Sequence, residues 1–160
     1  MADNVTIVRS LYDGWNNRDF DVLADATAPD GAITFMGSGE VLRGPEGSRI
    51  YSQMWASGFP DGQVTIDTIF ADGDRVVVEF TGRGTHTGTF VTSMGEIPPT
   101  GKSVTLKLCD VLELVDGKVT AQHSYLDTGS MMAQLGLLPA RGGLGETALL
   151  LLRGFGLRRR

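Results

Sequence analysis

The residues from Ser103 to Asp127 read SVTLKLCDVLELVDGKVTAQHSYLD and predict the β-hairpin on which the fold depends. Alternate positions of the first half are aliphatic with one exception, as expected for a strand with one buried face: Val104, Leu106, Leu108, Asp110, Leu112 and Leu114. Asp116-Gly117 is a strong signal for a two-residue turn before a second strand. The exception, Asp110, is a carboxylate on an apolar face, so it must be paired, protonated or functional.

A two-residue turn also predicts which residues of the hairpin lie opposite each other. If the residues that flank the turn pair, Asp110 lies opposite His123 on the inner face. Tyr125 and Asp127 then share that face. An imidazole beside a carboxylate exchanges protons near neutral pH, so the candidate catalytic residues are Asp110, His123 and Asp127. Alternatively, the Asp110–His123 pair is a structural bridge, Asp127 caps the next helix, or a β-bulge shifts the pairing by one residue.

The order of the elements predicts an α+β fold. The spacing of apolar residues favours helices over residues 3–17 and 45–56, with a short helix after Asp19 between them. A turn is expected at residues 29–31. Strands are expected at residues 32–36, 63–70, 75–87, 103–115 and 118–127, and a last short helix at 131–135. Helices followed by antiparallel strands should pack on one face of a curved sheet and enclose a cavity, which is a default ligand site.

Aromatic side chains are the candidate lining of this cavity, although a single aromatic residue is more often plain core than a ligand contact. The helix at 45–56 is expected to turn Ile50, Tyr51, Met54 and Trp55 inward. The candidate substrate-binding residues are Tyr12, Trp15, Phe35, Tyr51, Trp55, His86 and Tyr125. Of these, His86 either lies at the pocket mouth or makes a structural hydrogen bond.

Composition excludes several classes of protein. A chain of 160 residues favours one domain, and its net charge of −5 argues against a nucleic-acid surface. The single cysteine, Cys109, cannot form an internal disulfide, and two histidines without clustered partners make a poor metal site. We find neither a signal peptide nor an apolar stretch long enough to span a membrane, so a cytoplasmic location is expected.

The last residues differ in composition from the rest. Residues 1–139 are expected to form the folded domain, whereas residues 140–160 are rich in Gly, Leu and Arg. This extension is either loosely attached or a helix that packs on a partner or a lipid surface.

A series of short motifs, in their order and spacing, resembles the SnoaL-like polyketide cyclases, also called ester cyclases. The resemblance covers about residues 5–139. Its motifs are Asn17-Arg18-Asp19, Gly44-Pro45-Glu46-Gly47, Phe59-Pro60-Asp61, Gly84-Thr85-His86-Thr87-Gly88, Pro99-Thr100-Gly101-Lys102, Asp116-Gly117-Lys118-Val119 and Gln134-Leu135-Gly136.

The resemblance implies a cone-shaped α+β barrel, shared with ketosteroid isomerase and nuclear transport factor, that forms homodimers and uses no cofactor. It implies an intramolecular aldol condensation of a small aromatic polyketide ester. In the family a carboxylate on the last strand is the acid/base group, and a histidine on the neighbouring strand assists it. Here the neighbouring strand carries Asp110, and the last strand carries His123 and Asp127. The alternatives are a non-catalytic ligand-binding or dimerisation module, or a sister isomerase, hydroxylase or epoxide hydrolase.

Overall fold

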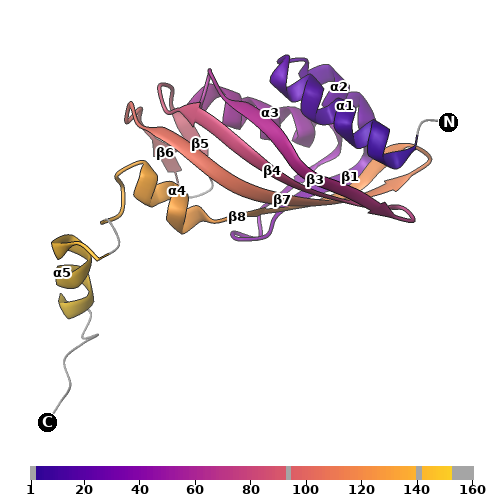
Figure 1. The fold of residues 1–160 in the computed structure, drawn as a ribbon. Helices are drawn as coiled ribbons and strands as arrows, with labels where there is room; N and C mark the ends of the chain where they lie inside the picture. The colour runs from indigo at the N-terminus through magenta and orange to yellow at the C-terminus, as the bar shows by residue number, and fades with distance from the viewer. Residues whose placement is uncertain (1–2, 93–94, 140–141, 153–160) are drawn as a thin grey trace, which may run out of the picture.

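The computed structural model describes residues 3–92, 95–139 and 142–152, and Figure 1 shows its ribbon. The helices are α1 (Asn4–Asn16), α2 (Phe20–Ala26), α3 (Gly44–Gly58), α4 (Thr128–Gln134) and α5 (Leu144–Leu152). The strands are β1 (Thr27–Phe35), β2 (Val41–Arg43), β3 (Gln63–Asp72), β4 (Arg75–Thr85), β5 (Phe90–Thr92), β6 (Gly95–Ile97), β7 (Ser103–Val115) and β8 (Lys118–Leu126). Helices α1, α2 and α3 lie across one face of the long curved strands (Figure 1).

The main sheet has the strand order β2-β1-β8-β7-β4-β3. Strands β1 and β8 run parallel, and the other neighbouring pairs in this sheet are antiparallel. The alternate aliphatic residues of β7 are buried, as predicted, and pack with the inner residues of β4 and α1 in one core. The predicted α+β fold, with helices on one face of a curved sheet, is therefore confirmed.

Strand β1 begins earlier than the sequence predicts. Residues 29–31, expected as a turn before the strand, lie inside β1, where its register against β8 shifts between Thr27 and Ala32. The chain is tightly packed at this point, because a Cβ on Gly31 would lie 2.7 Å from the carbonyl oxygen of Val119. The irregularity in the strand replaces the expected turn. Between β4 and β7, strands β5 and β6 pair with each other in a separate two-stranded sheet, in a segment where the sequence predicts no strand.

Helix α3 packs through small residues rather than through its largest aliphatic one. Ile50, predicted to point inward, is 45% exposed, so that prediction is wrong. The buried face instead carries Gly47, Ser48 and Ser52. A Cβ on Gly47 would lie 2.6 Å from the carbonyl carbon of Leu42, so the helix runs too close to β2 for a large side chain there. This close approach helps to fix the part of α3 that carries Tyr51 and Trp55.

The C-terminal helix α5 stands apart from the sheet in Figure 1. None of its residues is buried, and Leu144 and Leu152 are almost fully exposed. Among the described residues, no helix is both long and apolar enough to cross a membrane.

We expect a chain that ends at residue 139 to keep the stability of the full chain. Because α5 buries no side chain, deletion of residues 140–160 should change the free energy of unfolding by less than about 1 kcal/mol, or about 4 °C in Tm. Circular-dichroism melting of both chains measures the difference. A much larger loss of Tm would show that the extension belongs to the folded unit.

Candidate active site

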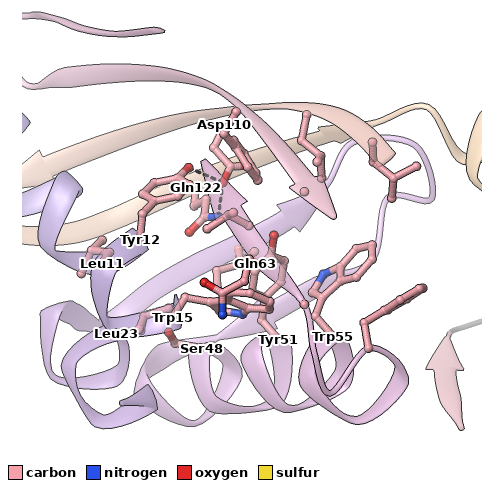
Figure 2. Close-up of a pocket in the computed structure, with 18 of the residues that line it drawn as sticks. Leu11, Tyr12, Trp15, Leu23, Ser48, Tyr51, Trp55, Gln63, Asp110 and Gln122 are labelled. Atoms are coloured by element: carbon pink, nitrogen blue, oxygen red, sulfur yellow. Dashed lines mark hydrogen bonds between the residues drawn. The ribbon is translucent and has the colours of Figure 1, made fainter. Parts of the chain in front are cut away.

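Asp110 lies near the middle of β7, on the face that the helices cover. In the sheet it pairs with Val78 of β4 and Ser124 of β8, and only 3% of it is exposed. The Tyr12 hydroxyl on α1 donates a hydrogen bond to Oδ2 of Asp110 at 2.8 Å, and Nε2 of Gln122 donates to the same oxygen at 3.1 Å (Figure 2). The other carboxyl oxygen, Oδ1, is buried without a hydrogen-bond partner. One side of this carboxyl group is thus held firmly, and the other is unpaired.

The surroundings of Asp110 favour its protonated form. Burial raises the pKa of the Asp110 carboxyl to about 6, although the side chains of Ser124, Tyr12 and Gln122 oppose the rise. Ser124 is close enough to lower the pKa of Asp110, but its side chain makes no hydrogen bond of normal geometry to Oδ1. Burial also raises the pKa of the Tyr12 phenol well above its usual value, and the charge of Asp110 adds to the rise. Tyr12 therefore stays protonated near neutral pH and remains a donor.

The predicted register of the hairpin is correct next to the turn but wrong at Asp110, which does not pair with His123. The two-residue turn forms as expected, since Val115 pairs with Lys118. The register then shifts after Leu114, so that Ser124 lies opposite Asp110 and His123 lies opposite Val111. This irregularity leaves Thr120 without a partner in the register and moves the following side chains to the opposite face of the sheet.

Three residues predicted to share the inner face with Asp110 therefore lie elsewhere. His123 is exposed, and Tyr125 is 43% exposed. Asp127 is exposed and forms the N-cap of α4, where its Oδ1 accepts a hydrogen bond from the Ser130 backbone N–H at 2.9 Å. The helix-cap alternative for Asp127 matches this geometry. None of the three lines the pocket that Asp110 faces.

That pocket lies between the sheet and helices α1, α2 and α3. It holds about 950 Å³ of empty space, part of it open to solvent. Of the predicted substrate-binding residues, Tyr12, Trp15, Tyr51 and Trp55 line it. Aliphatic side chains form much of the remaining wall: Leu11, Leu23, Ile33, Val64, Val104, Leu106, Leu108, Leu112 and Val119. The pocket is therefore mainly apolar, with polar groups gathered around Asp110 and on α3.

Phe35 and His86, also predicted to bind substrate, are not part of the pocket lining. Phe35 packs against Tyr51 with ring centroids 5.4 Å apart. His86 is fully buried, and its Nδ1 accepts a hydrogen bond from the Thr100 backbone N–H at 3.3 Å. Burial lowers the pKa of the His86 imidazole. The structural alternative for His86 thus matches its position.

Two residues beside Asp110, Gln122 and Ser124, are absent from the sequence-based candidates, and of the two only Gln122 lines the pocket. Both are on β8, and they take the inward positions that the register shift gives them. A signal was present in the sequence. The clear aliphatic residues of this strand, Val119 and Leu126, are separated by an odd number of positions, so they cannot share one face of a regular strand. Such spacing indicates a bulge between them.

Within the described parts of the chain, no three or more His, Cys, Asp or Glu side chains lie close enough together to hold a metal ion. Asp110 is the only acidic residue among those that line the pocket. The arrangement can exchange one proton with a bound molecule, and it offers neutral donors beside that carboxyl group.

Comparisons with known proteins find a matching family and similar solved structures. The family model of the SnoaL-like polyketide cyclases matches residues 5–135. No curated protein matches the chain. A solved structure from Jannaschia sp. CCS1, provisionally assigned as a SnoaL-like polyketide cyclase, is 27% identical with a TM-score of 0.75, and the match covers 86% of this chain and 93% of that one.

Two further structures are similar. IdmH from Streptomyces antibioticus, provisionally assigned as a polyketide cyclase, is 29% identical with a TM-score of 0.70, over 84% of this chain and 99% of that one. A protein with a ketosteroid isomerase-like fold from Catenulispora acidiphila is 21% identical with a TM-score of 0.69, over 82% of this chain and 92% of that one. The last likeness concerns the fold alone, and it agrees with the expected ketosteroid isomerase-like architecture.

Proposed function

Because this chain belongs to the SnoaL-like polyketide cyclase family, we propose that it is a cofactor-independent cyclase that closes a carbon ring in a small aromatic polyketide ester. The reaction is an intramolecular aldol condensation. The observation that carries the proposal is the Asp110 carboxyl group, which is buried in an apolar pocket with a pKa raised to about 6. A carboxyl group with such a pKa is a suitable acid/base catalyst near neutral pH.

In the proposed reaction Asp110 acts first as a base and then as an acid. Its carboxylate removes a proton from the carbon between two carbonyl groups, and the electrons of that C–H bond form an enolate. The enolate carbon attacks a ketone in the same molecule, which forms the new C–C bond and leaves an alkoxide. The alkoxide takes the proton back from Asp110. No proton or electron is gained or lost, so the product is an isomer of the substrate.

The neighbours of Asp110 have distinct parts in this proposal. The Tyr12 hydroxyl and the Gln122 amide both bind Oδ2, so they fix the orientation of the carboxyl group. Oδ1 has no protein partner and is the oxygen proposed to take the proton. The aromatic side chains of Trp15, Tyr51 and Trp55 offer flat surfaces for an aromatic substrate. An apolar wall also keeps water away from the enolate.

The proposal is tested by ring closure itself. An aromatic methyl ester that carries a β-dicarbonyl side chain and a further ketone within reach of it is a suitable substrate, because its cyclised product has the same mass but a different retention time in chromatography. The protein should convert it much faster than buffer does. Retention of such esters without conversion, over a panel of chain lengths, would instead favour a non-catalytic binding module. The homodimer belongs to the same proposal and is measurable by analytical ultracentrifugation.

The pH dependence of the reaction should report the titration of Asp110. The base form is required, so kcat/KM should rise about tenfold per pH unit below pH 6 and level off above it. Measurement of kcat/KM from pH 4.5 to 8 shows the position of the bend. The bend should persist in His123→Ala, because His123 is exposed and does not line the pocket. A profile that is flat down to pH 4.5 would contradict the assignment of Asp110 as the base.

A further inference from the structure

The indole N–H of Trp55 is a second polar group in the pocket wall without a partner. Its Nε1 atom is buried and makes no hydrogen bond. An indole nitrogen is a donor only, and buried donors in native proteins are nearly always satisfied. The described residues contain two other buried side-chain atoms of this kind, Oδ1 of Asp110 and Nε2 of His86. Of these three residues, Trp55 and Asp110 line the pocket, and His86 does not.

Packing fixes the direction of this N–H. The Trp55 ring lies against Phe90 and Phe59, with centroids 4.9 Å and 6.1 Å away. These contacts hold the ring, and Figure 2 shows its nitrogen turned toward the side chain of Tyr51. The Trp55 N–H lowers the pKa of the Tyr51 phenol slightly against the larger effect of burial, but the two groups form no hydrogen bond of normal geometry. The donor is therefore rigidly placed and free to bind another acceptor.

The Tyr51 hydroxyl connects the surroundings of Trp55 with those of Asp110. Its hydroxyl lies 3.4 Å from Oγ of Ser124, which is the partner of Asp110 in the sheet. Trp55, Tyr51 and Asp110 are thus polar groups in a pocket wall that is otherwise mainly apolar, and Ser124, outside the lining, connects Tyr51 to Asp110. A ligand that satisfies both unpaired atoms needs an acceptor at the Trp55 end and an acidic C–H or O–H at the Asp110 end.

We propose that Trp55 is a specificity-determining residue, whose indole N–H donates a hydrogen bond to a carbonyl oxygen of the bound molecule. This inference rests on the proposed function and adds the requirement for a ring-borne ketone, ester or quinone carbonyl beside α3. A ligand without that carbonyl leaves the indole N–H unpaired. Sites that are built to bind a polar group discriminate against analogues that lack it for this reason.

The test compares two probes of nearly equal shape, 2-acetylnaphthalene and 2-ethylnaphthalene, of which only the first carries a carbonyl. Their dissociation constants are measured by calorimetry on the wild type, on Trp55→Phe and on Trp15→Phe. Trp55→Phe should weaken the ketone about fivefold, the value of one hydrogen bond, and leave the hydrocarbon within about twofold. Trp15→Phe is the matched control, because Trp15 also lines the pocket but its nitrogen is not a buried unpaired atom. That variant should change both affinities by the same factor.

A second measurement works on the wild type, so it does not depend on the folding of a variant. The chain has two tryptophans, hence two indole N–H resonances in a nitrogen-15 spectrum, and the spectrum of Trp15→Phe assigns them. The Trp55 resonance should move downfield with the ketone and not with the hydrocarbon. The proposal is overturned if the ketone fails to bind, if that resonance responds equally to both probes, or if Trp55→Phe weakens both probes alike. Neither probe can cyclise, so these results are independent of whether the protein turns over an ester.

Discussion

Replacement of Asp110 by asparagine is expected to lower kcat for ring closure by about 10²–10⁴-fold, the usual contribution of a positioned acid/base group. Asparagine has nearly the same shape, and its carbonyl oxygen can still accept the hydrogen bond that the Tyr12 hydroxyl donates to Asp110 at 2.8 Å. Its amide cannot take a proton from carbon. The rate of formation of the cyclised isomer, measured under single-turnover conditions, gives the effect on chemistry alone.

The controls for this experiment are the two residues that the register shift places outside the pocket. His123 and Asp127 are both exposed, so His123→Ala and Asp127→Asn should keep kcat within about twofold of the wild type. Asp127→Asn removes a charge from the N-cap of α4 but leaves an oxygen that can still accept from Ser130. If either variant lost as much activity as Asp110→Asn, or if Asp110→Asn stayed fully active, the assignment of Asp110 would be wrong.

The sequence was sufficient to predict the architecture because the strongest patterns come from long elements. Strand β7 alternates over its whole length, and α1 repeats apolar residues at helical spacing, so each signal is the sum of many positions. The prediction that Asp110 lies on the buried face depends only on this alternation. For that reason the prediction holds although the pairing partner was wrong.

The pairing partner could not be found by counting from the turn. A single extra residue in β8 reverses the direction of every later side chain, and the turn sequence contains no information about it. The inner residues Gln122 and Ser124 are polar, so the hydrophobic pattern of β8 is too weak to indicate its own register. Only the odd spacing of Val119 and Leu126 marks the irregularity.

The network around Asp110 depends on contacts between residues that are far apart in the chain. Tyr12 and Asp110 are 98 positions apart, and their hydrogen bond forms because α1 packs over β3 and β4, from where the Tyr12 side chain reaches Asp110 on the neighbouring strand β7. There Tyr12 also packs edge-on against Phe80 at 5.0 Å between ring centroids. The sequence indicates that both residues face the interior. The distance between them follows from the crossing of the helix over the sheet, which no local pattern encodes.

The Asp110→Asn variant is also expected to be more stable than the wild type at alkaline pH. The pKa of Asp110 is raised from 3.8 to about 6 in the folded state, so folding favours the protonated carboxyl group. The stability that this preference contributes is complete below about pH 3.8 and is lost as the pH rises through about 6. A difference of about two pKa units corresponds to about 3 kcal/mol. Asparagine is neutral at every pH and does not undergo this loss.

Urea unfolding of both proteins between pH 4 and pH 8 measures the effect. The difference in free energy of unfolding, variant minus wild type, should rise by about 2 to 3 kcal/mol over this range, because only the wild type must hold a buried charge at the upper end. Other titrating groups cancel in the difference. Asp30→Asn is the matched control: Asp30 is exposed, so its charge stays in water and no comparable rise is expected.

The sign of this difference separates a catalytic from a structural carboxylate. A buried carboxylate whose hydrogen bonds fully offset its desolvation would make the fold weaker when replaced, and the difference would then fall as the pH rises. In this chain Oδ1 is left unpaired, and the two donors at Oδ2 do not prevent the rise of the pKa. The fold is thus expected to hold an ionised group that destabilises it near neutral pH. Faster ring closure would explain why the chain keeps a carboxylate where an amide would give a more stable protein.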